Sequence, residues 1–170
     1  MTVYNREVWI DASKEKVWEV IADFGNIYLF NPTIAKSYLT SDKTSGLGTT
    51  RQCNFEGINA HIKERIVSYK EGESMRVEIY DGKGAPPFKT AFGSFFLQEE
   101  DGGTLVKGIF EYELKFGPIG ILMDALMVKP KFSGAWDGVL AGLKKHVETG
   151  QEINATTSKS LDFTPVVAIA

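Results

Sequence analysis

The sequence predicts an α+β protein in which one antiparallel sheet packs against a long C-terminal helix, and two observations carry this prediction. Residues 33–116 divide into a run of strand-like segments separated by short loops rich in Gly, Asp, Lys and Pro. Short loops between successive strands imply antiparallel pairing. The segment that follows, residues 118–148, is helical, because its apolar residues recur at the spacing of one helix face.

The chain begins with a strand and two helical pieces. Val8 and Ile10 share one parity of the strand at residues 3–10. Ser13 is a typical N-cap, and apolar residues at helical spacing follow it, so we expect a helix over 14–23. A second helical turn, over 25–30, ends before Asn31-Pro32 because the residue before a proline avoids helical angles.

Six further strands are expected before the closing helix. Their predicted ranges are 33–40, 48–55, 58–69, 74–80, 88–98 and 104–116. The loop DGKGAPP, between the fourth and fifth of these, is interpreted as an ordinary hairpin connection, with a lid over a binding site as the alternative.

The closing helix has a clear start, an irregularity and an end. Pro118 begins it, and Pro130 predicts a break or bend because proline supplies no N–H to the helix. Gly150 ends it. We therefore predict one domain over residues 1–149 and a tail over 150–170, for which the composition favours disorder over docking on the domain.

Composition and charge exclude several classes of protein. The 170 residues carry a net charge of −3 without a basic cluster, which argues against nucleic acid or an anionic membrane as the main partner. No segment is long and apolar enough for stable membrane insertion, and no signal core is present, so we expect a cytoplasmic protein. His61 and His146 lie far apart and Cys53 is the only cysteine, so neither a metal nor another cofactor is predicted.

The segment TTRQCNFEGINAHIKERIV contains the clearest candidate for chemistry. If Glu56-Gly57 forms a two-residue hairpin loop, Arg51 and Glu64 are diagonal neighbours on the apolar face of the hairpin. A buried charge without a partner is costly, so the two side chains must pair with each other, contact water or contact a ligand. Two interpretations stay open: Arg51 and Glu64 hold or activate a ligand, or they form a structural ion pair.

The chain resembles the polyketide cyclase/dehydrase-like branch of the START-like (SRPBCC) superfamily. The phrases that carry the resemblance are VWIDASKEKVWEVIADFGNI, GLGTTRQC, IKERIVSYKEGESMRVEI, GGTLVKGIFEYEL and GPIGILMDALMVKPKFSGAWDGVLAGLKKHVE. The resemblance implies a helix-grip fold, in which a curved seven-stranded antiparallel sheet wraps around the C-terminal helix and leaves a cavity. Phe30 stands before Asn31-Pro32, where many relatives have tryptophan.

In such a fold the parity of each strand predicts the ligand-binding residues. On the sheet they are Arg51, Cys53, Phe55, Ile62, Glu64, Met75, Val77, Ile79, Phe92, Phe110 and Tyr112, and on the helices Met123, Met127, Phe132, Trp136, Val139 and Leu143. Phe92, Phe95 and Phe96 do not share one parity. Phe92 is chosen because a five-residue EEDGG loop would place it opposite Phe110.

The resemblance leaves three functions open. The first is binding, with transport as an extension, of a hydrophobic small molecule such as a lipid, isoprenoid or aromatic polyketide. The second is a cyclase or dehydratase in which Arg51 polarises a carbonyl and Glu64 or Tyr112 moves a proton. The third is a protein-interaction module like a chaperone activator. The sequence favours binding because no second acid/base pair accompanies Arg51 and Glu64, and it fixes neither enzymatic activity nor oligomeric state.

Overall fold

The computed structural model describes the backbone of residues 1–170 and all side chains except those of Ile121, Met123, Met127 and Pro130. The strands in the described chain are β1 (Thr2–Ile10), β2 (Ile34–Leu39), β3 (Thr50–Phe55), β4 (His61–Lys70), β5 (Ser74–Lys83), β6 (Phe88–Glu100), β7 (Gly103–Leu114) and β8 (Val167–Ala168). The helices are α1 (Lys14–Ala22), η1 (Phe24–Leu29), α2 (Gly117–Met123), η2 (Asp124–Val128), α3 (Lys129–Thr149) and η3 (Thr157–Ser160).

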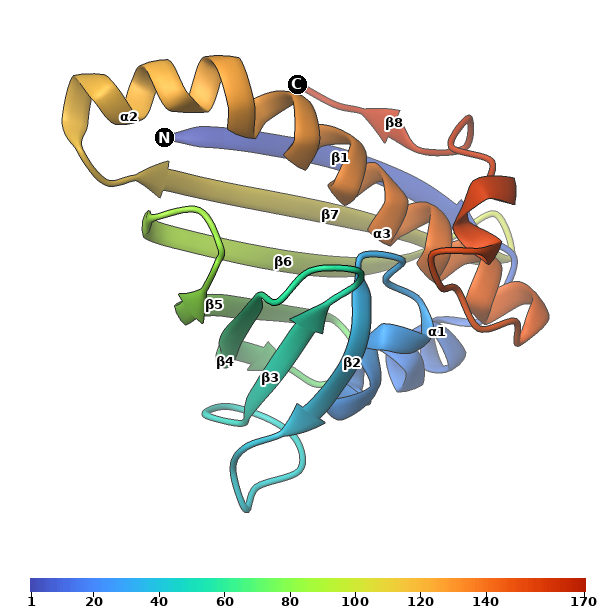
Figure 1. Cartoon of the computed structure of the whole chain (residues 1–170). Coiled ribbons are helices and arrows are strands. Elements are labelled where there is room, and N and C mark those ends of the chain that lie inside the picture. The colour runs from blue at the N-terminus through green and yellow to red at the C-terminus, as the bar shows by residue number, and fades with distance from the viewer.

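The strands form one antiparallel sheet in the order β2-β3-β4-β5-β6-β7-β1-β8. Figure 1 shows that the strand direction turns strongly between β1 and β2, so the sheet is curved, and that the α2–α3 helix crosses its concave side. The predicted fold, a curved sheet of seven long strands around the C-terminal helix, is therefore confirmed. The two-residue β8 is an addition that the sequence did not predict.

The predicted helix ends agree with the structure, and the irregularity takes a different form. Ser13 caps α1 by accepting a hydrogen bond from the backbone N–H of Lys16, and Gly150 ends α3 with a φ of 72°. The helix does not break at Pro130. Instead the five residues of η2, just before it, are π-helical. Because a proline leaves one carbonyl of the preceding turn without its N–H partner, a local change of helix type relieves the mismatch.

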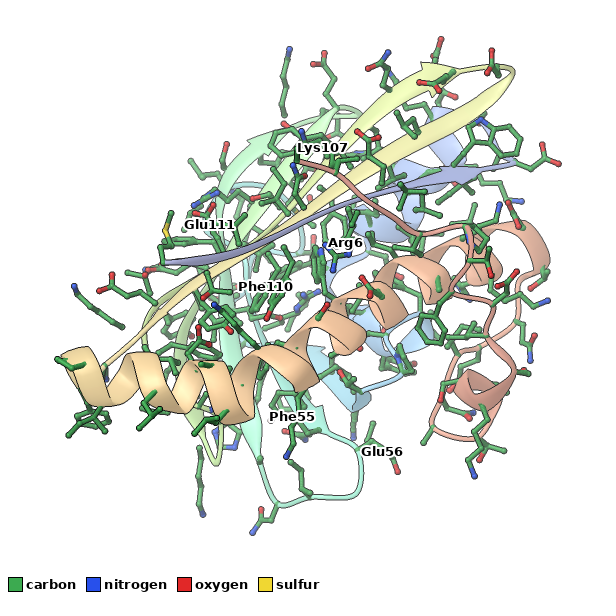
Figure 2. All side chains as sticks on the ribbon, turned by 90° about the horizontal axis from the view of Figure 1, so that it is seen from above. Arg6, Phe55, Glu56, Lys107, Phe110 and Glu111 are labelled. Atoms are coloured by element: carbon green, nitrogen blue, oxygen red, sulfur yellow. The ribbon has the colours of Figure 1, made fainter. Side chains whose placement is uncertain are left out.

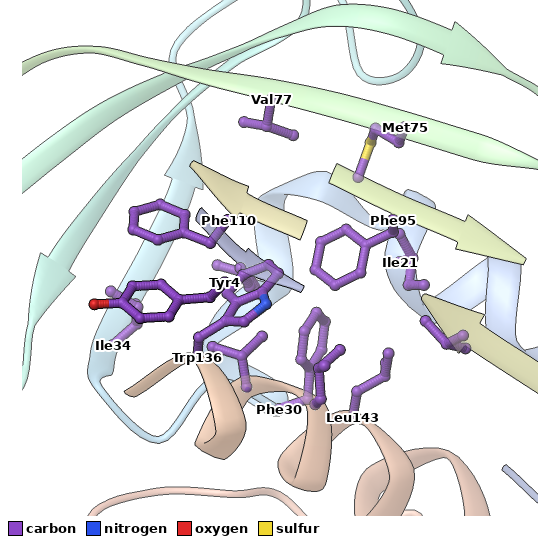
Figure 3. Packing of buried hydrophobic residues seen from close by; sticks show 14 of the residues in the cluster. Tyr4, Ile21, Phe30, Ile34, Met75, Val77, Phe95, Phe110, Trp136 and Leu143 are labelled. Carbon is purple, nitrogen blue, oxygen red and sulfur yellow. The ribbon is translucent and has the colours of Figure 1, made fainter. Parts of the chain in front are cut away.

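The core lies between α3 and the concave face of the sheet. Figure 3 shows Trp136 and Leu143 of α3 pointing toward Phe95 and Phe110 of the sheet. Gly142 allows η1 to approach this helix, because a Cβ there would lie 2.1 Å from the carbonyl oxygen of Phe30. The close approach of Phe30 to α3 thus requires a glycine at position 142.

The prediction that Phe92 faces the core is wrong. β6 and β7 are joined by a two-residue turn, Asp101-Gly102, in which both residues have positive φ, whereas the prediction assumed a five-residue loop. The loop length differs by an odd number of residues, and an odd shift exchanges the two faces of a strand. Phe92 therefore pairs with Glu111 on the convex face, and Phe95 is the phenylalanine that enters the core.

The β3–β4 hairpin shows the opposite case. Its loop is two residues longer than predicted, so Arg51 lies directly opposite Glu64 instead of Ile62. An even shift leaves each side chain on its predicted face. Arg51, Cys53 and Glu64 are accordingly buried, while the residues that alternate with them are partly or fully exposed.

The segment after Gly150 docks on the domain, contrary to the favoured expectation of a disordered tail. The side chain of Ile153 is buried and its N–H donates to the carbonyl of Leu29. Further on, β8 pairs with the free edge of β1, and the N–H of Ile169 donates to the carbonyl of Asn5. The boundary predicted at residue 150 stays a prediction.

Candidate functional site

An aromatic cluster fills the middle of the space between α3 and the sheet. Ring centroids of neighbouring members lie 5.5–5.8 Å apart. The members, which we call the aromatic cluster from here on, are Phe88, Phe95, Phe110, Tyr112, Phe132 and Trp136. Figure 2 shows Phe110 on the helix side of the sheet and Glu111 on the other side, as strand alternation requires. One polar group of side chains lies on β3 and β4 of the same sheet, and a second meets this cluster at Tyr112.

The first polar group, the Arg51 group, lies on β3 and β4 under η1. The Nε of Arg51 donates to Oε2 of Glu64 at 2.6 Å, and its Nη1 donates to the carbonyl of Phe24 at 2.9 Å. The guanidinium carbon lies 3.9 Å from the centre of the Phe24 ring, and the Cys53 thiol donates to the same Glu64 oxygen at 3.2 Å. Arg51 is 4% and Glu64 9% exposed, so both are enclosed and paired within the protein.

Electrostatics in the Arg51 group reinforce the pairing. Burial disfavours the charge on Arg51, but the attraction of Glu64 outweighs it and raises the pKa of the guanidinium. Burial, followed by the negative charge of Glu64, raises the pKa of the Cys53 thiol well above its ordinary value. The group therefore holds a charged guanidinium and a protonated, unreactive thiol.

The second polar group, the Asp124 group, lies where β1, β7 and η2 meet, at the Tyr112 end of the aromatic cluster. Asp124 accepts hydrogen bonds from the hydroxyls of Tyr112, at 2.5 Å, and Thr2, at 2.6 Å. The ammonium of Lys129 lies 3.8 Å from its Oδ2. The Tyr4 hydroxyl contacts that of Tyr112 at 3.4 Å and donates to the carbonyl of Lys129 at 3.1 Å.

The Asp124 group borders an opening in the surface. A pocket of about 150 Å³ lies there, and its lining residues are Met1, Thr2, Tyr112, Glu113, Leu114, Gly117, Gly120 and Asp124. Asp124 begins the π-helical η2, and short π-helical stretches within α-helices occur frequently at functional sites. Its carboxylate is thus presented to the pocket by an irregular part of the helix.

The tyrosines of the Asp124 group stay protonated at neutral pH. Burial, and then the hydrogen bond to Asp124, raises the pKa of Tyr112 far above that of a free phenol. Burial also raises the pKa of Tyr4. Both hydroxyls therefore act as hydrogen-bond donors and acceptors rather than as sources of a proton.

Most of the predicted lining residues lie on the concave face. Nine are buried in the core: Cys53, Ile62, Met75, Val77, Phe110, Tyr112, Trp136, Val139 and Leu143. Phe55, Ile79 and Phe132 are partly buried against that core. Arg51 and Glu64 are buried as described above, Phe92 lies on the convex face, and the side chains of Met123 and Met127 lie outside the described residues. Tyr112 is the one predicted residue in the Asp124 group.

The sequence-based reasoning missed the other members of the Asp124 group. Asp124 is the single acidic residue in the apolar helical segment IGILMDALMV, and that pattern was a signal that could have identified it. Thr2 and Tyr4 carried no comparable signal, because polar residues near the start of a first strand are common.

The described part of the chain gives no basis for a metal site or a membrane span. Among the described side chains, no three His, Cys, Asp or Glu residues gather as metal ligands would. Within the same described residues, every helix is too short or too polar to cross a bilayer.

Fold and site together define a helix-grip protein with an aromatic core and a polar pocket at one end. The family model described as "Polyketide cyclase / dehydrase and lipid transport" matches residues 1–148. The chain belongs to this family, and the resemblance seen in the sequence is confirmed. A search of curated proteins finds no match.

Solved structures share the fold at low sequence identity. A protein from Thermus thermophilus is 19% identical, with a TM-score of 0.70 over 86% of this chain and 97% of that one. A START superfamily protein from Mycobacterium smegmatis is 17% identical, with a TM-score of 0.69 over 88% and 99%. A major latex-like protein from Panax ginseng is 18% identical, with a TM-score of 0.59 over 78% and 95%. These likenesses confirm the helix-grip fold.

Proposed function

We propose that the chain binds a hydrophobic small molecule, such as a lipid, an isoprenoid or an aromatic polyketide, at the Asp124 end of the concave face. The observation that carries the proposal is an aromatic cluster that ends in a polar group beside an open pocket. Binding sites for small molecules typically combine apolar walls with a few convergent polar groups. The description of the family includes lipid transport, which supports the same proposal. Transport would follow from reversible binding.

The bound molecule must displace part of the protein. The pocket of about 150 Å³ is smaller than the roughly 300–1,000 Å³ of typical ligand sites. Phe88 packs edge-on against both Tyr112 and Phe132, and Phe132 is tilted against Tyr112, so the two phenylalanine rings occupy the space into which an apolar chain would extend. We infer that α2 and η2 shift outward and that these rings turn aside on binding, because the π-helical stretch is the least regular part of the cover.

The chemistry of the Asp124 group selects the polar end of the ligand. A carboxylate only accepts hydrogen bonds, so Asp124 favours a ligand that presents a hydroxyl or another donor. The Tyr112 hydroxyl already donates to Asp124, and its oxygen is available to accept from the same ligand. An alcohol or phenol at the end of an apolar molecule fits this arrangement.

Geometry and pKa favour binding over the cyclase or dehydratase alternative. An efficient general acid has a pKa near the working pH, and burial moves the pKa of Tyr112 in the other direction. Arg51 and Glu64 already satisfy one another, the Phe24 carbonyl and Cys53. A catalytic role for Arg51, Glu64 or Tyr112 stays a prediction, as do the chaperone-activator alternative and the cytoplasmic location.

Native mass spectrometry of the protein purified from its own cells tests the proposal. We expect a bound apolar molecule that denaturation releases, and we expect the emptied protein to bind hexadecanol or geranylgeraniol more tightly than the corresponding methyl ethers. Asp124→Asn and Tyr112→Phe should weaken alcohol binding by about tenfold each, the effect of one lost hydrogen bond to a charged or buried group.

Matched controls separate this effect from a general loss of stability. Asp81→Asn and Tyr80→Phe make the same chemical changes on the exposed part of β5 and should leave binding unchanged. A protein that binds neither the alcohols nor their ethers would overturn the proposal. Equal binding of alcohols and ethers would support the apolar site but would show that Asp124 does not anchor the ligand.

A further inference from the structure

The outer side of α2 and η2 carries apolar side chains into solvent, the reverse of an ordinary surface helix. Ile119, Leu122 and Leu126 are 67%, 60% and 70% exposed, and their spacing places them on one helix face. Phe116, 63% exposed, extends this face at the start of the helix. We call these four side chains the apolar stripe. Single exposed apolar residues are common, but a contiguous row of them marks an interaction surface.

Lysines bracket the apolar stripe. Lys115 precedes Phe116, and Lys129 and Lys131 follow Leu126; all three are exposed. The one acidic residue between Lys115 and Lys131 is Asp124, which is buried and lies 3.8 Å from the Lys129 ammonium, so the three lysines outnumber it. The chain as a whole has a net charge of −3, so this helix is a local region of positive charge on an otherwise acidic protein.

The rest of the described chain does not cover the stripe. Figure 1 shows α2 at the end of the long helix farthest from η3, while β8 lies along β1. A second copy of the chain is a poor occupant, because pairing two such helices in either direction would bring lysines against lysines. An anionic surface complements them.

We propose that the apolar stripe docks on the interface of an anionic phospholipid bilayer. Ile119, Leu122 and Leu126 would enter the boundary between headgroups and acyl chains, while Lys115 and Lys129 contact lipid phosphates. A helix with this pattern lies in the interface plane without crossing the membrane. The pocket beside Asp124 is lined by Gly117 and Gly120 of the same helix, so docking would bring the pocket opening close to the lipid. The net negative charge of the chain argued against an anionic membrane partner, and the exposed lysines at both ends of the apolar stripe revise that expectation.

Vesicle flotation tests the proposal without reference to any ligand of the pocket. The wild-type protein is expected to float with vesicles of phosphatidylcholine and phosphatidylglycerol, more weakly with phosphatidylcholine alone, and less as salt is raised. Leu122→Ser/Leu126→Ser should weaken the partition by at least about tenfold, since two exposed leucines no longer enter the interface. Lys115→Gln, which leaves the contact between Lys129 and Asp124 in place, should weaken it by about fivefold on anionic vesicles only.

The matched control is Leu47→Ser/Ile58→Ser, which changes two leucine-sized side chains that are equally exposed on the loops flanking β3. It should float like the wild type. The proposal is wrong if the wild type does not float with anionic vesicles, or if the stripe and control variants float equally. Sedimentation velocity adds a second readout: a dimer that Leu122→Ser/Leu126→Ser dissociates, without vesicle binding, would assign the stripe to a second copy instead.

Discussion

The Arg51 group and the Asp124 group are both buried polar clusters on one concave sheet, yet they differ in what surrounds them. Arg51 meets a carboxylate, a backbone carbonyl and an aromatic face, under a 3₁₀ helix that closes the site. Asp124 meets two hydroxyls and a distant ammonium, on a π-helical segment beside a pocket. In the first arrangement the polar groups bond to one another and to the backbone, and in the second they lie near an opening.

Burial and charge alone therefore do not identify a binding group. Arg51 and Glu64 are the strongest charges on the apolar face, but their bonds to each other, to the Phe24 carbonyl and to Cys53 leave fewer polar atoms for a ligand. Asp124 is less conspicuous in the sequence, but its carboxylate lies beside a pocket that a ligand could enter. The two groups also differ in the helix that covers them, which is the 3₁₀ helix η1 over Arg51 and the π-helical η2 at Asp124.

The largest expected effect is on stability at the Arg51 group. Glu64→Gln leaves the buried guanidinium without its counter-charge, and breaking a buried ion pair in this way costs about 3–5 kcal/mol. We expect the Tm to fall by about 10 °C for a chain of this size, measured by differential scanning calorimetry. Ligand affinity, referred to the folded fraction, should not change.

The double variant Arg51→Met/Glu64→Leu serves as the control, because it removes both charges together. It should recover most of the lost stability. If Glu64→Gln instead melted within about 2 °C of the wild type, the pair would not be the structural element described above.

A smaller loss of stability, with a gain of binding, is expected inside the aromatic cluster. Phe132→Ala removes a partly buried ring that packs between Phe110, Phe88 and Tyr112, at a cost of about 2–3 kcal/mol. The space it leaves lies next to the pocket, so hexadecanol should bind more tightly in calorimetric titration. Unchanged or weaker binding would place the ligand elsewhere.

The smallest expected effect concerns the Tyr112 hydroxyl and depends on pH. Tyr112→Phe should cost about 1 kcal/mol at pH 7, from the lost hydrogen bond to Asp124. The pKa of Tyr112 is raised in the folded protein above its unfolded value, near 10. The stabilisation by the neutral phenol is therefore complete below about pH 10 and is lost as the pH rises further.

Urea titrations at neutral pH and above pH 10 measure this difference. The stability advantage of the wild type over Tyr112→Phe should shrink above pH 10, whereas Tyr80→Phe, on an exposed tyrosine, should show no such trend. An advantage that stayed constant with pH would mean that the Tyr112 hydroxyl is not buried against Asp124.

The sequence predicted the elements of this fold because each has a local cause. Alternating apolar residues, turn residues between them, Ser13 and Gly150 are all visible without the structure, and their positions agree with it. Strand faces depended on loop lengths, which are set by turn geometry. The predicted β3–β4 loop was wrong by an even number of residues, so Arg51 stayed on the correct face. The predicted β6–β7 loop was wrong by an odd number of residues, so Phe92 was placed on the wrong face.

The candidate site was harder to predict because it depends on tertiary contacts. Tyr112 was found by strand parity, but Asp124 enters the site through a π-helical stretch, whose residues do not follow the spacing of an α-helix. Thr2 reaches Asp124, 122 residues away in the sequence, because β1 pairs with β7. The docking of the C-terminal segment depends likewise on the free edge of β1, which its own composition does not reveal.

The most direct test of the account is an amide NMR titration of the protein with hexadecanol. We predict that the largest shift changes fall on the first residues of β1, the last residues of β7, and α2 and η2 around Asp124. The amides of β3 and β4 around Arg51 and Glu64 should stay nearly unchanged. Shift changes centred on Arg51, Glu64 and η1, with little effect around Asp124, would contradict the account and make the Arg51 group the ligand site.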